Sequence, residues 1–224
     1  MKVLIFDSGA LINLSMNGLL YILPELKKNF DGKFIVTSQV RYETVDRPIG
    51  IEKFELGAIM VQNLIDEGVL DDIGTLDITE EQVKEGTKRL MDEANHAMKI
   101  KNDWVHLVEE GEMSCLAVSN ILDERKIENI IAIDERTTRM LGENPGNLER
   151  IMSEKLHQRV QIVASNLDSF ENVRFIRSSE LVFVAYKKGI IKLEGKQVLE
   201  ALLYATKFKG SSISFDEINV LKKE

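Results

Sequence analysis

Short runs of consecutive apolar residues alternate along this chain with stretches in which apolar residues recur every three or four positions. The runs contain many β-branched residues, which is typical of strands buried on both faces of a parallel sheet. The stretches with the helical period predict α-helices that cover such a sheet, so the chain is expected to fold as α/β. Strands are expected at residues 3–6, 34–36, 130–133 and 173–176, and a short one within 69–76.

Turn and capping residues mark the ends of the expected helices. Ser38 is expected to cap a short helix that Pro48 stops, and Thr79 with Gln82 forms a capping-box pattern before a long charged helix. We interpret this charged helix as a solvated projection or a dimer arm. Helices are expected at about residues 10–16, 19–28, 39–45, 51–68, 80–101, 113–121, 135–141, 148–160, 179–188 and 198–205, and a last one opens at Ser214.

Length and composition fit one α/β domain over residues 1–224. The chain has 224 residues, of which 44% are hydrophobic, and this is enough for a sizeable core. We find no apolar run as long as a membrane-spanning helix, and the first residues enter a strand directly. We therefore expect a cytoplasmic protein without a membrane partner.

Cysteine and histidine are both scarce. The single cysteine, Cys115, excludes an intramolecular disulfide framework and a cysteine-rich zinc site, and it suits a reducing compartment. We interpret Cys115 as a core residue rather than a nucleophile, because no histidine lies near it in the sequence. The three histidines lack His-x-x-x-His spacing, so a histidine-based metal site is not expected.

The formal net charge is −8, which argues against a protein that coats nucleic acid through a basic surface. This charge is compatible with a nuclease, because an active site that collects carboxylates is itself negative and works with cations. Contacts to nucleic acid must then come from local basic patches or from a partner.

Two of the expected strands end in an aspartate that is followed at once by a helix. Asp7 follows the run at 3–6, and Asp134 follows the run at 130–133. Either aspartate alone could simply cap the next helix. Two parallel strands that each deliver an aspartate at the carboxyl end are harder to explain by capping, because open α/β sheets bind ligands at that edge.

Two glutamates occupy comparable places at the starts of helices. Glu43 lies three residues after Val40 in the helix expected after the second strand, and Glu112 falls in the first turn of the helix that begins near Gly111. A structural interpretation competes here as well, because acidic residues in a first turn are stabilised by the helix dipole.

If these four carboxylates converge, they favour a divalent cation. A cluster of carboxylates costs repulsion and desolvation unless a cation neutralises it. Oxygen ligands suit Mg²⁺ or Mn²⁺ and not zinc. Such ions assist displacement at phosphorus, so hydrolysis of phosphodiester bonds is the expected reaction class.

The order of these motifs resembles the PIN domain family. The segments VLIFDSGALINL, TSQVRYETV, EGEMSCLAVSNIL and IIAIDERTTRML follow one another as in stand-alone prokaryotic PIN proteins, and the late segments SSELVFVAYKKGII and VLEALLYATKFKGSSISFDEINVLKK are similar to their last helices. The resemblance implies a three-layer α/β/α fold with a central, mainly parallel sheet. Departures at about 50–105 and 143–170 are expected to be helical insertions.

The resemblance also implies a divalent-metal endoribonuclease, either toxin-like or RNA-processing, that acts on RNA with Mg²⁺ or Mn²⁺ as cofactor. The catalytic motif positions are Asp7, Glu43, Glu112 and Asp134, and metal ligation is expected from Asp7, Glu112 and Asp134. Ser8 is expected to help order the site. Many members carry another acid two residues beyond the last aspartate, where this chain has Arg136, so a full second metal site is not implied. A homodimer and an antitoxin-like partner are further expectations.

Candidate contacts to substrate phosphates are Arg136, Arg139, Lys187 and Lys188, although basic residues at helix ends are more often only solvated. Two other functions remain open. The first is a PIN-fold module that binds RNA or protein with little activity. The second is an aspartyl-phosphate phosphatase of the haloacid dehalogenase type, which needs a second acid where this chain has Gly9.

Overall fold

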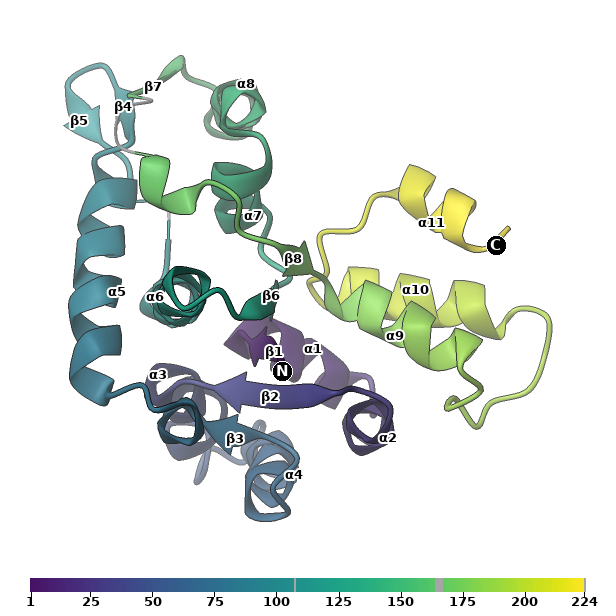
Figure 1. Cartoon of the computed structure of the whole chain (residues 1–224). Helices are drawn as coiled ribbons and strands as arrows, with labels where there is room; N and C mark the ends of the chain where they lie inside the picture. Colours follow the sequence, from purple (N-terminus) through teal and green to yellow (C-terminus); the bar gives the residue numbers. More distant parts are fainter. Residues whose placement is uncertain (107, 164–166, 224) are drawn as a thin grey trace.

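A five-stranded parallel sheet forms the centre of the computed structural model, which describes residues 1–106, 108–163 and 167–223. The strand order is β3-β2-β1-β6-β8 (Figure 1). The strands are β1 (Lys2–Phe6), β2 (Gly32–Val36), β3 (Asp71–Asp72), β6 (Glu128–Ala132) and β8 (Phe175–Ile176).

The central strand explains the apolar run near the start of the chain. β1 pairs in parallel with both β2 and β6, so that Leu4 lies opposite Phe34 on one side and Ile130 on the other. Helices cover both faces, and Val3 to Phe6 are consequently at most 4% exposed.

Helices form a layer on each face of this sheet (Figure 1). On one face, α6 (Glu110–Glu124) contacts β1 and β6, and α5 (Glu80–Asn95) packs along its outer side. The other face carries α1 (Ser8–Met16), α2 (Ile22–Lys28) and α9 (Ser178–Lys187), with α10 (Val198–Phe208) against α9 and α11 (Phe215–Leu221) against α10. The expected three-layer α/β/α class is therefore confirmed.

The remaining elements lie around the edges of the sheet. α1 contacts both α4 and the π-helical turn η1, which continues directly from α3. These elements are α3 (Ser38–Arg41), η1 (Tyr42–Asp46), α4 (Glu55–Asp66), the 3-10 turns η2 (Ile73–Leu76) and η4 (Asp168–Phe170), α7 (Arg136–Glu143) and α8 (Pro145–Leu156).

A small antiparallel sheet occupies segments that were expected to be wholly helical. β4 (Met98–Ile100) pairs with β5 (Asp103–Trp104) and with β7 (Val160–Ile162). The expected helices at 80–101 and 148–160 are thus too long. The second ends at Leu156 because His157 has a left-handed φ of 50°. The partner strands are far apart in the sequence, and no local pattern announces their pairing.

The long charged helix α5 is not a projection. Its capping box from Thr79 to Gln82 forms as expected, but Val83, Leu90 and Ala94 are buried along the side that faces α6. A Cβ at Gly86 would lie 2.9 Å from the Cβ of Ala117, so the glycine lets the two helices approach closely. The charged residues of α5 cover its outer side only.

A second, smaller core joins the last helices. Leu199, Leu203, Ile213 and Ile218 are buried together between α9, α10 and α11. Within the described ranges, no helix has the length and apolar character needed to cross a membrane.

Candidate functional site

The carboxyl ends of β1 and β6 meet at the centre of the sheet. From β1 the sheet continues through β2 and β3 in one direction, and from β6 it continues through β8 in the other. The helices that follow the two strands, α1 and α7, therefore diverge and leave a crevice, the place where open α/β sheets bind ligands. A cavity of about 630 Å³ lies at this point.

All four acids singled out in the sequence line this one cavity. Three further carboxylates join them there, so the cavity is strongly acidic. Segments separated by more than a hundred residues along the chain supply them. The lining carboxylates are Asp7, Glu43, Glu109, Glu110, Glu112, Asp134 and Glu135.

Asp7 caps α1 with only one of its two oxygens. Asp7 Oδ2 accepts a hydrogen bond from the Gly9 amide at 3.0 Å. Asp7 is only 3% exposed, and its Oδ1 is buried without a hydrogen-bond partner among the residues that the structure describes. Burial, together with the nearby charges of Glu43 and Asp134, raises the pKa of Asp7 to about 7. Helix capping therefore accounts for Oδ2 of Asp7, whereas Oδ1 can still accept a bond from a ligand.

Glu112 is held from two sides in the first turn of α6. It accepts hydrogen bonds from the Thr138 hydroxyl and, at 3.4 Å, from the Glu109 amide, which gives the helix a capping box. Burial, together with the charges of Asp7 and Glu135, raises the pKa of Glu112 to about 8. The side chain therefore takes a proton readily unless a positive charge is nearby.

Asp134 connects the cavity to the start of α9. It accepts a hydrogen bond from the Ser178 amide at 2.9 Å and another from the Ser178 hydroxyl at 2.6 Å. Burial raises the pKa of Asp134, and these hydrogen bonds oppose the effect. Asp134 thus lies just after β6 and binds the N-terminus of α9, the helix that follows the neighbouring strand β8.

Glu43 reaches the cavity from the π-helical turn η1. Gln39 Nε2 donates to Glu43 Oε1 at 2.9 Å, and the wide turn closes with a bond from the Arg47 amide to the Tyr42 carbonyl. Tyr42, Glu43 and Arg47 all line the cavity. π-Helical turns are frequent at functional sites, and sequence patterns do not predict them.

The helix that carries Glu43 begins one residue earlier than expected. Thr37 and not Ser38 is the N-cap, because the Thr37 hydroxyl accepts from the Val40 amide at 3.2 Å. Ser38 instead donates to Glu80 at 2.6 Å. The Thr37 hydroxyl also lies 2.7 Å from that of Ser114, which fixes α3 against α6 beside the cavity.

Ser8, which was expected to help order the site, lines the cavity. The expected phosphate contacts Arg136, Arg139, Lys187 and Lys188 are not among the lining residues. Arg136 is an exposed first residue of α7, and Arg139 pairs with Glu143 at 2.7 Å. Both arginines lie on α7, whose N-cap residue Glu135 does line the cavity.

Two basic residues that the sequence did not single out line the cavity instead, Arg47 and Lys209. Lys209 is brought there because Asn13 on α1 donates to the Thr206 carbonyl at 2.9 Å, which fixes the end of α10 beside α1. The sequence around Arg47 indicates only that it lies at the end of the helix stopped by Pro48, and not that it faces the cavity. For Lys209 we find no local signal, since it depends on a contact across most of the chain.

Cys115 lies beneath the cavity floor as a buried core residue. Its thiol is 3.5 Å from the Phe6 carbonyl oxygen, and burial raises its pKa well above the ordinary value. A thiol in this state is a poor nucleophile, which agrees with its interpretation as part of the core.

The acids fit a hydrated divalent cation better than a closed metal cage. Over the part of the chain that the structure describes, no three His, Cys, Asp or Glu side chains already form a group that could hold a metal ion. Asp7 Oδ1, however, is a buried oxygen without a partner among carboxyl groups whose pKa values are raised. Mg²⁺ commonly keeps several waters and binds through one or two carboxylates, and this donor set suits that mode.

Comparisons of the chain with protein-family models, with curated proteins and with solved structures gave no match. The function must therefore be argued from the geometry and chemistry of the cavity.

Proposed function

We propose that the protein is a divalent-metal-dependent endoribonuclease with a PIN-like fold, toxin-like or RNA-processing in role. The observation that carries the proposal is the unpartnered, buried Asp7 Oδ1 in a cavity shared with Glu43, Glu112 and Asp134. The resemblance of the ordered motifs to PIN domains supports the same function.

Each acid has a distinct role in this proposal. Asp7, Glu112 and Asp134 would hold Mg²⁺ or Mn²⁺, while Glu43 would complete the shell or orient the attacking water. The bound ion would lower the pKa of that water and neutralise charge on the phosphate. Gln39 and Ser178 keep Glu43 and Asp134 in place through the hydrogen bonds described above.

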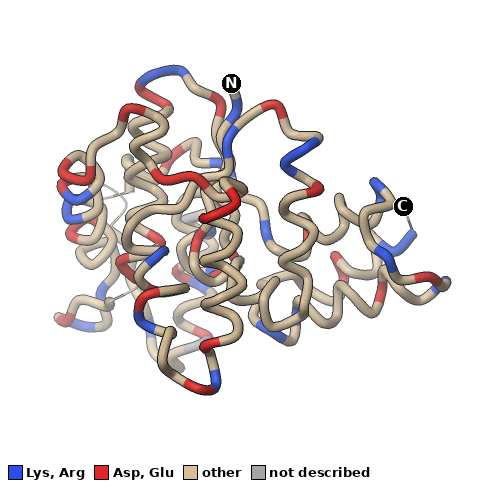
Figure 2. Tube along the Cα trace, turned by 90° about the horizontal axis from the view of Figure 1, so that it is seen from below, with Lys and Arg blue, Asp and Glu red and all other residues tan. Residues whose placement is uncertain are grey.

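Substrate contacts are assigned to the basic residues at the cavity. Arg47 and Lys209 supply positive charge to phosphates on a chain whose basic residues are otherwise interspersed among more numerous acids (Figure 2).

The direct test offers a panel of end-labelled RNAs and single-stranded DNA to the pure protein. We expect cleavage of RNA with Mn²⁺ or Mg²⁺ and none with EDTA, because the acids need a cation to act on a phosphodiester. If RNA binds equally well with EDTA and is never cut, the protein is instead the weakly active binding module.

Glu43 can be displaced without changing its own chemistry. A Cβ at Gly111 would lie 2.5 Å from Glu43 Oε2, so Gly111→Ala should push this carboxylate aside. We expect a cleavage rate lower by about tenfold, with unfolding free energy changed by less than about 1 kcal/mol, since a flexible side chain can yield. Cleavage kinetics and urea unfolding measure the two effects. Unchanged cleavage would remove Glu43 from the mechanism.

An exposed apolar face beside the cavity supports the proposal of a homodimer. Its side chains come from α1, η1, α4 and the intervening loop, and they are 41–71% exposed. Their exposed area is on the order of 700 Å², close to the roughly 800 Å² per partner of a standard interface. The face consists of Ile12, Met16, Tyr42, Ile49, Ile51, Phe54, Leu56 and Ile59.

Leu56→Asp is expected to weaken self-association at least about tenfold, because it places a charge on this face. Val220→Asp is the matched control, since Val220 is also exposed but lies on α11. Sedimentation velocity over a concentration series measures both. A wild-type protein that stays monomeric at high concentration would contradict the homodimer and leave the face to an antitoxin-like partner.

A further inference from the structure

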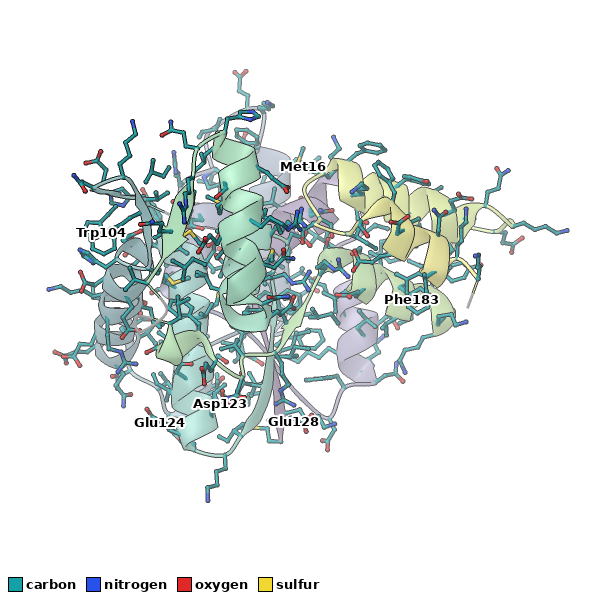
Figure 3. The ribbon with its side chains drawn as sticks, turned by 90° about the horizontal axis from the view of Figure 1, so that it is seen from above. Met16, Trp104, Asp123, Glu124, Glu128 and Phe183 are labelled. Atoms are coloured by element: carbon teal, nitrogen blue, oxygen red, sulfur yellow. The ribbon has the colours of Figure 1, made fainter. Side chains whose placement is uncertain are left out.

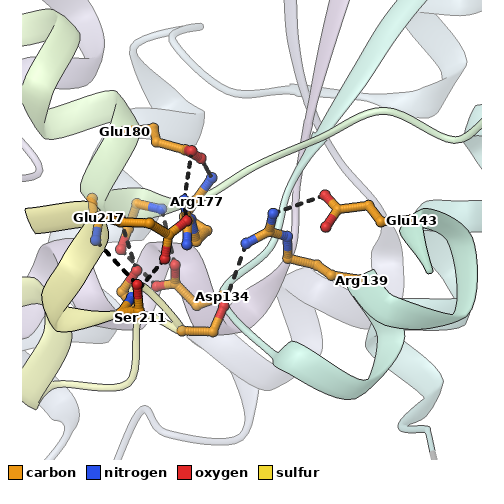
Figure 4. A network of polar contacts seen from close by, with 11 residues as sticks. Asp134, Arg139, Glu143, Arg177, Glu180, Ser211 and Glu217 are labelled. Atoms are coloured by element: carbon orange, nitrogen blue, oxygen red, sulfur yellow. Dashed lines mark hydrogen bonds and ion pairs between the residues drawn. The ribbon is translucent and has the colours of Figure 1, made fainter. Parts of the chain in front are cut away.

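Arg177 is a buried arginine held by two carboxylates from different helices. It lies just after β8 and is 6% exposed. Arg177 Nη2 donates to Glu180 Oε1 at 2.8 Å and to Glu217 Oε1 at 2.7 Å, and its backbone amide donates to Glu180 Oε2 at 2.7 Å. Both the side chain and the backbone of this residue are therefore fixed (Figure 4).

The next residue along the chain holds one of the acids of the cavity. Ser178 supplies the amide and the hydroxyl that Asp134 accepts, at 2.9 Å and 2.6 Å. Two donors on one residue act together only if the first turn of α9 keeps its orientation. That orientation depends on Arg177, which is the N-cap residue of α9.

One of the two carboxylates comes from the far end of the chain. Glu217 lies on α11, forty residues after Arg177, and its other oxygen accepts from the Ser214 amide at 2.7 Å. Burial opposes ionisation of Glu217, but the hydrogen bonds from Arg177 and Ser214 lower its pKa to about 2, so it stays charged. α11 thus offers a permanent negative charge to the residue that begins α9.

The two ion pairs also keep the guanidinium group of Arg177 from pairing with Asp134, where it would compete with a bound cation. Arg177 and Asp134 lie close together in the network of Figure 4. With two carboxylates as partners, Arg177 has its charge neutralised, and Asp134 is left to the neutral donors of Ser178. An arginine released from Glu217 could turn toward another acid, and the nearest part of the cavity offers Asp134.

We propose that Arg177 is a positioning residue for the metal-binding acid Asp134, and that Glu217 on α11 holds Arg177 in the position this requires. The inference rests on the proposed function for its effect on metal binding. Its structural part, the fixing of the first turn of α9 by a residue of α11, stands on the contacts alone.

Glu217→Gln tests the link, because it removes the charge and keeps the size of the side chain. Glu200→Gln is the matched control: it breaks the Lys222–Glu200 pair of 2.9 Å, which also ties α11 to α10 but does not reach Arg177. Both variants are made in the full chain, and thermal unfolding checks that α10 and α11 remain folded in each.

Three measurements are compared between the two variants. We expect Glu217→Gln to weaken Mn²⁺ binding in calorimetric titration about fivefold. Residues that contact a metal ligand directly typically contribute ten- to a hundredfold to metal affinity. Glu217 should contribute less, because it acts on Asp134 only through Arg177 and Ser178. Cleavage should fall at limiting Mn²⁺ and recover at saturating Mn²⁺. Amide hydrogen exchange in residues 178–181 should accelerate. Glu200→Gln should change none of the three.

Equal effects of the two variants would overturn the proposal, since they would show only that α11 stabilises the fold. Unchanged Mn²⁺ affinity together with unchanged exchange in Glu217→Gln would also overturn it. If the wild-type protein neither binds Mn²⁺ nor cuts RNA, the proposed function fails. The exchange comparison then decides the structural part by itself: acceleration only in Glu217→Gln supports it, and equal protection refutes it.

Discussion

Asp7→Asn is expected to reduce metal-dependent RNA cleavage by at least about a hundredfold while the protein remains folded. Asparagine can still accept from the Gly9 amide through its carbonyl oxygen, so the cap of α1 is preserved. Its amide nitrogen replaces the oxygen that has no partner, and it carries no charge to bind a cation. The substitution thus keeps the helix-capping role of Asp7 and removes its proposed role in binding a metal ion. Changes around metal ligands alone commonly cost ten- to a hundredfold, which sets the lower bound.

Glu128→Gln is the matched control for Asp7→Asn. Glu128 is the first residue of β6 and lies at the amino-terminal end of the strand, away from the carboxyl end that carries the cavity (Figure 3). Its exposed side chain forms ion pairs of 3.6 Å with Lys2 and 3.7 Å with Arg174. Single-turnover cleavage at saturating Mn²⁺ and circular dichroism give the comparison, and this control should cut as fast as the wild type. Cleavage by Asp7→Asn at the wild-type rate would remove the cavity from the reaction.

The metal-free protein is expected to lose stability as the pH rises from 5 to 8. The pKa of Asp7 is raised from 3.8 to about 7 and that of Glu112 from 4.5 to about 8. Between the unfolded and folded values, the folded chain binds more protons than the unfolded chain, so unfolding free energy falls with increasing pH. At about 1.4 kcal/mol per pKa unit, the total loss is on the order of several kcal/mol. This contribution is complete only below the unfolded pKa of 3.8, and it is lost as the pH rises through the folded pKa values of about 7 and about 8.

Urea unfolding in EDTA at a series of pH values measures this slope. Millimolar Mg²⁺ should restore stability at pH 8, because a cation favours the ionised carboxylates that burial penalises. Asp7→Asn should make the slope shallower, since Asp7 no longer titrates while Glu112 and Asp134 still do. A protein that is equally stable at pH 5 and pH 8 without metal would show that the acids are not strained by their burial.

Features with a local origin in the sequence were predicted well. The run at Val3 to Phe6 is buried and the alternation of strands and helices gives the parallel sheet, because burial on both faces leaves only apolar residues at such positions. The same logic located Asp7 and Asp134, since an acid directly after a buried strand lies at the carboxyl edge. The ends of strands thus predicted two of the four acids, whereas Glu43 and Glu112 were proposed from their places near the starts of helices.

Features that depend on distant contacts could not be predicted. Lys209 reaches the cavity through the bond from Asn13 to Thr206, and β4 forms because β7 lies beside it. The turn η1 differs from an ordinary helix by one residue in its hydrogen bonding, and no residue type signals this. Arg136 and Arg139 are not among the residues that line the cavity, and nothing in the sequence around them shows which side of α7 faces it.

The C-terminal segments have a consequence for the timing of the proposed activity during synthesis. Lys209 follows α10 and lines the cavity, and Glu217 on α11 completes the contacts of Arg177. A nascent polypeptide whose last helices are still inside the ribosome has neither. Under the proposed function, such a chain would leave its own message uncut until α11 has emerged.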